Sequence, residues 1–245
     1  MYYFASDIHL GSGTSEQSRS RELRFVRWLE EMSEDAEAIF LVGDVFDFWY
    51  EYRRVVPKGF TRLLGALSAL TDRGTEIHFF TGNHDMWIGD YLHGECGLVL
   101  HTKAEIMNLY GRRCYIAHGD NELIEPPLSL RLMNCVFRSE GARCLFSRLV
   151  HPDAALRFGR WWSGRSRKLK ALSHEFGGES EPLVRYARRM SERDPSIDCF
   201  IFGHNHCAEI YPLGGGAEAV FLGEWIEHPT YAALGPDGKV RLLAY

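Results

Sequence analysis

The chain has 245 residues, of which 45% are hydrophobic and 25% are charged, and its formal net charge is −5 at pH 7. These proportions are ordinary for a folded soluble protein, and they argue against an intrinsically disordered chain and against a membrane-spanning one. The length allows one large α/β domain, or a domain with a subdomain, and either can bury a substantial core.

The first residues, MYYFASDIHL, contain neither a basic stretch nor a long apolar run. The sequence therefore predicts no signal peptide and no transmembrane helix, and we expect a cytoplasmic protein.

Six cysteines are spread along the chain without any CxxC pair. In a chain of this length, that pattern indicates reduced thiols in a reducing compartment.

In the first third of the chain, apolar runs that end in polar residues alternate with helical patterns. The runs at 2–6, 38–43 and 76–82 predict strands. Apolar residues at three- and four-residue spacings predict helices at 22–32 and 59–74 between them. Such an alternation is typical of parallel β-α-β connections.

Further strands are predicted toward the C-terminus. Two more runs with polar endings lie at 113–120 and 198–206. Short apolar runs separated by Gly and Pro then predict antiparallel strands at 208–213, 218–225, 230–234 and 240–245. We therefore expect an α/β fold in which parallel-rich and antiparallel strands form a two-sheet α/β/β/α sandwich with the helices outside.

One segment does not follow this alternation. Between Leu128 and Lys170 the sequence has no strand pattern, and it holds ten Arg and Lys residues against two acids, Glu140 and Asp153, a net charge of +8. Apolar stretches such as LSLRLMNCVF and LRFGRWW are interleaved with these basic residues. The pattern favours a helical cap over 128–175, inserted into one domain that spans 1–245. A helical subdomain with a solvated basic face is the alternative.

Polar clusters follow five of the predicted strands, and each cluster alone is also typical of a turn. They are Asp7 and His9 in SDIHLG, Asp44 and Asp47 in GDVFD, Asn83, His84 and Asp85 in GNHD, His118 and Asp120 in HGD, and His204 and His206 in GHNH. Because the carboxyl ends of parallel strands meet at one edge of a sheet, these loops are expected to converge there.

The side chains in these clusters are mixed hard and borderline metal ligands. Carboxylates, imidazoles and an amide oxygen suit Mn²⁺, Fe²⁺, Zn²⁺ or Ni²⁺ better than an all-oxygen Ca²⁺ cage. They are too numerous for one tetrahedral ion. The set instead fits two divalent ions that share a carboxylate, which is the arrangement used in phosphoryl chemistry.

The ordered motifs D-x-H, G-D-x-x-D, G-N-H-D, H-G-D and G-H-x-H resemble those of the calcineurin-like metallophosphoesterases. The resemblance implies that Asp7, His9 and His206 hold one ion, that Asn83, His118 and His204 hold the other, and that Asp44 bridges them. It also implies that water activated between the ions attacks phosphorus. His84 would act on the phosphoryl or leaving oxygen, Asp47 would orient His84, and Asp85 would fix the turn.

Within that superfamily, the chain is similar to the UDP-2,3-diacylglucosamine diphosphatases of lipid A biosynthesis, particularly the Bacteroidetes-type sequences. The resemblance lies in GDVFDFWYEYRRVVPKGF, HFFTGNHDMW, WWSGRSR and FLGEW. It implies a Mn²⁺ pair and cleavage of the substrate pyrophosphate to UMP and lipid X. It also implies substrate drawn from the cytoplasmic face of the inner membrane. The residues implied to contact the substrate are Asn83, His84, Ser163, Arg167, Lys170 and His204.

The sequence departs from this family at two positions. His84 stands where some members have Arg, and Pro126 stands where an Asp is common, with Glu125 beside it. The second departure leaves open a phosphoesterase that acts on another phosphodiester or diphosphate, such as a nucleotide or a phospholipid head group. A metal-bearing scaffold without turnover is a further alternative. A nuclease is disfavoured, because no long basic track with stacking aromatic residues is present, and we expect no nucleic-acid partner.

Overall fold

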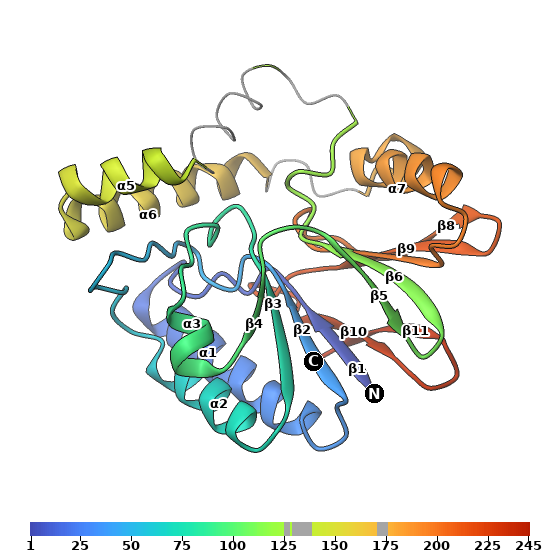
Figure 1. Cartoon of the computed structure of the whole chain (residues 1–245), viewed down its shortest axis with the longest axis horizontal. Coiled ribbons are helices and arrows are strands. Elements are labelled where there is room, and N and C mark those ends of the chain that lie inside the picture. The colour runs from blue at the N-terminus through green and yellow to red at the C-terminus, as the bar shows by residue number, and fades with distance from the viewer. Residues whose placement is uncertain (125–127, 129–138, 171–175) are drawn as a thin grey trace.

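The computed structural model describes residues 1–124, 128, 139–170 and 176–245. Within these residues the chain forms two stacked β-sheets with helices on their outer faces (Figure 1). The six-stranded sheet has the order β11-β10-β1-β2-β3-β4, and the five-stranded sheet has the order β5-β6-β7-β9-β8. No described helix is long and apolar enough to cross a membrane.

The six-stranded sheet is parallel in its central part. Its strands are β1 (Tyr2–Ala5), β2 (Ala38–Val42), β3 (Glu76–Phe80), β4 (Val99–His101), β10 (Thr230–Leu234) and β11 (Val240–Ala244). β1, β2, β3 and β4 are parallel, whereas β10 pairs antiparallel with both β1 and β11. All five residues of β2 are buried. This is why the strand reads as the unbroken apolar run AIFLV and not as an alternating pattern.

The five-stranded sheet is mixed. Its strands are β5 (Glu105–Leu109), β6 (Arg112–Ala117), β7 (Cys199–Phe202), β8 (Ala208–Gly214) and β9 (Ala217–Leu222). β6, β7 and β9 run parallel, and β5 and β8 close the two edges antiparallel. The two sheets pack on an apolar layer that includes Phe4, Phe40, Ile201 and Val220.

Helices cover the outer face of each sheet. The helices are α1 (Ser15–Met32), α2 (Thr61–Asp72), α3 (Tyr91–Cys96), α5 (Glu140–Leu149), α6 (Pro152–Lys170), α7 (Pro182–Arg193) and the 3-10 turn η1 (Gly178–Ser180). α1, α2 and α3 lie over the six-stranded sheet, and α7 lies over the five-stranded sheet (Figure 1). The predicted two-sheet α/β sandwich is therefore confirmed.

The predicted elements are present, with several differences at their ends and edges. α1 begins before the predicted 22–32, because Thr14 and Gln17 form a capping box that starts the helix at Ser15. The sequence analysis missed α3, α7 and the strands β4 and β5. The antiparallel prediction for the C-terminal strands was incomplete, because β9 also pairs parallel with β7.

The basic segment is helical where the structure describes it. Helices α5 and α6 lie above the edge of the sheets at which the parallel strands end (Figure 1). Pro126 and Glu125 lie outside the described residues. The backbone of α6 continues to Lys170, but the side chains of Arg167 and Lys170 lie outside the described part, so their predicted contacts stay predictions.

Candidate metal centre

The polar clusters all stand directly after the carboxyl ends of β1, β2, β3, β6 and β7. Several of their non-glycine residues have positive φ angles, which L-residues adopt at a cost of about 1–3 kcal/mol each. These are Asp7 (56°), His9 (48°), Asp44 (53°), His204 (69°) and His206 (60°). Strain concentrated in one set of loops indicates that the surrounding fold holds these side chains in place for function.

Glycines allow these loops to approach one another closely. A Cβ atom added at Gly82 would lie 2.6 Å from the backbone nitrogen of Asp44, and one added at Gly203 would lie 2.7 Å from Oδ2 of Asp7. Neither distance is possible for real atoms. The Gly of G-N-H-D and the Gly of G-H-x-H are therefore required by the packing of the loops, as well as by their turns.

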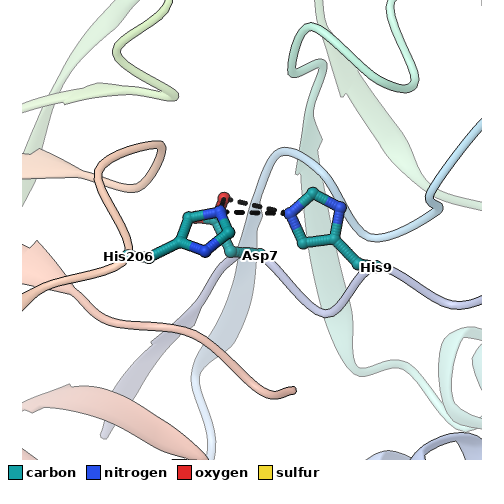
Figure 2. Close-up of side chains that lie close together, drawn as sticks. All are labelled: Asp7, His9 and His206. Carbon is teal, nitrogen blue, oxygen red and sulfur yellow. Dashed lines mark hydrogen bonds and ion pairs between the residues drawn. The ribbon is translucent and has the colours of Figure 1, made fainter. Parts of the chain in front are cut away.

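The first cluster consists of Asp7, His9 and His206, whose side chains point toward one another (Figure 2). Nε2 of His206 lies 3.1 Å from Oδ1 of Asp7, and Nε2 of His9 lies 3.5 Å from the same oxygen. The two Nε2 atoms are 3.2 Å apart. One carboxylate oxygen and two imidazole nitrogens thus face a common point, as ligands of one ion do.

Asp44 stands at the centre of the wider cluster. Its Oδ2 lies 3.3 Å from Nε2 of His118 and 3.8 Å from Nε2 of both His9 and His84. Asp44 is fully buried. A carboxylate in this position lies between the imidazoles proposed for the two ions. This is the geometry required of a group that bridges them.

Several candidate ligand atoms in this centre are buried and have no hydrogen-bond partner among the described residues. They are Oδ1 of Asp7, Oδ2 of Asp44, Oδ1 of Asn83 and Nε2 of His118. Unsatisfied buried polar atoms are rare in folded proteins and call for an explanation such as an ion. They fit a site for two divalent metal ions.

The remaining atoms of the same side chains are held by the backbone. Oδ2 of Asp7 accepts from the backbone N–H of His204 at 2.8 Å, and Oδ1 of Asp44 accepts from that of His84 at 2.9 Å. Nδ1 of His118 lies 2.9 Å from the carbonyl oxygen of Val42, to which it donates. One atom of each group is thus fixed by the backbone, and the other points into the centre. Second-sphere hydrogen bonds orient the ligands of metal sites in the same way.

The electrostatics of the centre favour positive charge. Burial alone would raise the pKa of Asp7 and Asp44, but the facing imidazoles, led by His206 and His118 respectively, lower both well below the usual value. Burial opposes charge on His118 as well, yet the Asp44 carboxylate raises the pKa of His118 to about 10. Metal ions would take the place of these protons, since histidine binds metal in its neutral form.

Two predicted ligands lie at the margin of these clusters. The ring of His204 stands edge-on to the ring of His118, with centroids 5.2 Å apart. Asn83 is half-buried, and its Oδ1 is one of the unsatisfied atoms.

Asp85 is fully buried and accepts from the backbone N–H groups of Gly82 (2.7 Å) and Val45 (2.9 Å). It therefore ties the loop after β3 to the loop after β2.

His84, Asp47 and Ser163 form a second set of contacts beside the centre. Nδ1 of His84 lies 2.9 Å from the carbonyl oxygen of Asp47. The hydroxyl of Ser163 lies 2.6 Å from Oδ1 of Asp47 and 2.7 Å from Nδ1 of His84. Ser163 is 1% exposed and bonded to these two residues, and its predicted contact with substrate stays a prediction.

Other residues support the first loop without having been singled out from the sequence. Ser6 donates to Oδ2 of Asp7 at 2.5 Å, and Arg21 of α1 donates to the carbonyl oxygen of His9 and to Ser12, each at 2.7 Å. Neither residue belongs to a spaced motif. The one sequence signal for Ser6 is its position, since it lies between the first strand and the D-x-H motif.

A cavity of about 1100 Å³ opens beside His206. It is lined by residues of α1, by Gly164 of α6, and by the loop from Glu224 to Thr230. Glu224 holds that loop by accepting from the backbone N–H groups of Glu227 and His228. The cavity offers space for a substrate group next to the metal centre.

The comparisons with known proteins agree with this geometry. A family model described as calcineurin-like phosphoesterase matches residues 2–208. The chain is 40% identical to a UDP-2,3-diacylglucosamine hydrolase of Porphyromonas gingivalis, over 98% of this chain and 95% of that protein. It is 27% identical to the protein of that name from Actinobacillus succinogenes, over 96% of each.

Among solved structures, the hypothetical protein PH1004 from Pyrococcus horikoshii has a TM-score of 0.50 at 10% identity, covering 100% of this chain and 88% of that one. At this identity the likeness concerns the fold alone. The family match, in contrast, spans every loop that carries a ligand cluster. The chain therefore belongs to the calcineurin-like phosphoesterase family.

Proposed function

We propose that this enzyme hydrolyses the pyrophosphate of UDP-2,3-diacylglucosamine, releasing UMP and lipid X. The observation that carries the proposal is the 40% identity over nearly the whole chain to a protein named for that activity. The buried Asp and His clusters support it, because a pair of divalent ions is the catalytic device of this family.

In this proposal Asp7, His9 and His206 hold one ion, Asn83, His118 and His204 hold the other, and Asp44 holds both. Mn²⁺ is the metal we propose, since it accepts this mixture of carboxylate, amide and imidazole ligands. The bound ions would activate water and neutralise charge on the phosphoryl oxygens. His84 and Asp47 act beside them, with Nε2 of His84 directed toward the centre.

The substrate binds, in this proposal, between the metal centre and the cap predicted at 128–175, of which α5 and α6 are described. Arg167 and Lys170 contact its phosphate and sugar, as the resemblance implies. The segment from Leu128 to Lys170 carries a charge of +8, which complements a diphosphate and an anionic membrane surface.

We also propose that the cap rests on the cytoplasmic face of the inner membrane. Large apolar side chains of α5 and α6 are exposed, including Leu145 (59%), Leu149 (74%) and Trp161 (58%). They lie on the same helices as the exposed basic residues Arg148 and Arg157. Apolar and basic side chains together are typical of surfaces that enter the interface of an anionic bilayer.

The proposal is tested by incubating the purified protein with Mn²⁺ and UDP-2,3-diacylglucosamine in water enriched in heavy oxygen. The expected products are UMP and lipid X, with the label in UMP, because attack is proposed at the phosphorus nearest the nucleoside. Label in lipid X would place the attack at the other phosphorus.

A small chromogenic phosphodiester, bis(p-nitrophenyl) phosphate, serves as the comparison substrate. Turnover of this diester without turnover of the acylated nucleotide sugar would favour the alternative, a phosphoesterase with another natural substrate. That alternative is kept because Pro126 replaces the Asp that is common in the related enzymes.

A further inference from the structure

Helix α6 of the cap makes a buried contact with the two residues proposed to act beside the metal ions. The hydroxyl of Ser163 lies within hydrogen-bond distance of both Oδ1 of Asp47 (2.6 Å) and Nδ1 of His84 (2.7 Å). All three side chains are buried. The contact joins α6 to loops that follow β2 and β3, so it connects the cap to the catalytic loops.

The chemistry of these atoms assigns the hydrogens. A serine hydroxyl has one hydrogen to donate, and an ionised carboxylate can only accept, so Ser163 donates to Asp47. Its oxygen must then accept from Nδ1 of His84. The carbonyl oxygen of Asp47, 2.9 Å from the same nitrogen, can also only accept. Nδ1 therefore carries a hydrogen, and Nε2 is the atom directed at the centre, 3.8 Å from Oδ2 of Asp44.

The position of Ser163 depends on how the cap helices dock on residues 48–52. The hydroxyl of Tyr50 donates to the carbonyl oxygen of Arg143 (2.9 Å), and that of Tyr52 donates to the carbonyl oxygen of Val150 (3.0 Å). Gly159 of α6 packs on Phe48 so closely that a Cβ atom would overlap the ring. These contacts hold α6 one turn before Ser163 against the loop that carries Asp47.

We infer that Ser163 is a positioning residue through which the docked cap fixes the ring orientation and tautomer of His84. This inference rests on the proposed function, in which His84 acts on the phosphoryl group. It gives Ser163 a task beyond the predicted contact with substrate. A cap that served only to bind lipid would need no bond to His84, whereas this one sets the geometry of the chemical step for every substrate.

The test uses Ser163→Ala with bis(p-nitrophenyl) phosphate, which is too small to need the lipid-binding surface. Loss of a side chain that orients a catalytic or metal-binding group typically costs about 10- to 100-fold in activity. We expect kcat for this diester to fall by about that factor, with KM nearly unchanged and the metal content equal to that of the wild type. Ser163→Thr, which keeps a hydroxyl, should recover part of the rate.

Two controls separate positioning from other roles. Ser180→Ala removes an exposed hydroxyl of η1, which donates to the carbonyl oxygen of Gly177, and should leave kcat unchanged. In a His84→Ala background, Ser163→Ala should cost nothing further, because the two residues act as one unit. Multiplying losses in that double variant would overturn the inference.

Three further results would distinguish the positioning role of Ser163 from the alternatives. Unchanged kcat for the small diester with a loss confined to the acylated substrate would make Ser163 a substrate contact. If Ser163→Ala melts at a much lower temperature, the isosteric Ser163→Cys is measured instead, and full kcat in that variant would also overturn the inference. Failure of the wild type on the acylated substrate would reject the proposed substrate while leaving this comparison intact.

Discussion

At the scale of single residues, Asp44 has two separate tasks. Its Oδ1 accepts from the backbone N–H of His84, and its Oδ2 faces His9, His84 and His118 without a hydrogen-bond donor among the described residues. The substitution Asp44→Asn keeps an acceptor for His84 but removes the charge between the ions. It therefore tests the bridging role with little disturbance of the turn.

We expect Asp44→Asn to lose most of its bound metal and nearly all activity on every phosphodiester, since the metal ions supply several kcal/mol of barrier lowering. Metal content by elemental analysis and turnover at saturating Mn²⁺ check this. Asp72→Asn, at an exposed carboxylate at the end of α2, is the matched control. Activity of Asp44→Asn within tenfold of the wild type would contradict a shared bridging carboxylate.

His84 is expected to behave differently, because its ring is held by Asp47 and Ser163 and its proposed task is on the substrate. His84→Ala should retain both metal ions and lose about 10²- to 10⁴-fold in kcat, the usual range for a positioned acid or base. Parallel measurement of metal content and kcat separates the two effects. Loss of metal together with rate would make His84 a ligand.

The sequence predicted which side chains gather in the centre better than it predicted the contacts around them. Asp7, His9, Asp44, His118 and His206 could be singled out because each follows an apolar run at a motif spacing, and the structure brings them together. The hydrogen bond from Ser163 to Asp47 joins residues 116 positions apart. No local pattern predicts such a contact, because it depends on how the cap docks.

At the scale of elements, the sequence predicted the central strands and two of the four edge strands, β8 and β11, but missed β4 and β5. β4 and β5 are edge strands, and several of their residues, including Val99, Glu105 and Ile106, are exposed. Without burial on both faces they lack the apolar run that marks β2 or β7. The start of α1 was missed for another reason: its capping box lies in a polar stretch without helical periodicity.

The cap helices provide a prediction at this scale. Leu149→Ser combined with Trp161→Ser should weaken binding to vesicles of anionic phospholipid by about tenfold or more. Each large apolar side chain contributes about 1.5–3 kcal/mol when it leaves water completely, and about 1.4 kcal/mol corresponds to a tenfold change in binding. Vesicle co-sedimentation at constant ionic strength measures the effect.

Leu23→Ser is the matched control for this experiment, because Leu23 is an exposed apolar residue of α1 on the main sandwich. It should leave vesicle binding unchanged. Binding that is equally strong for the cap variant, or that falls as much in Leu23→Ser, would contradict a membrane-facing cap. Turnover of the small diester should be unaffected in both variants, since none of the three residues belongs to the metal centre.

At the scale of the whole molecule, the stacking of the two sheets brings the residues of the site together. Parallel strands from both sheets end on the same side, so loops from residue 7 to residue 206 meet at one centre. The sequence predicted this convergence because the carboxyl ends of parallel strands meet at one edge of a sheet. The strain in those loops and the buried charges of Asp7 and Asp44 must be offset by the rest of the fold or by bound metal.

This coupling predicts that metal removal lowers the stability of the whole chain. An ion at about 100 times its dissociation constant stabilises the folded state by about 2.7 kcal/mol. For a domain of this size, each kcal/mol shifts the melting temperature by about 2–4 °C. Adding Mn²⁺ to chelator-treated protein should therefore raise the melting temperature by about 5–10 °C for one site, and by more if both fill. Asp44→Asn should lose most of this shift and Asp72→Asn should keep it. Equal melting temperatures for the wild type with and without Mn²⁺ would mean that the fold, and not the ion, holds the strained loops in place.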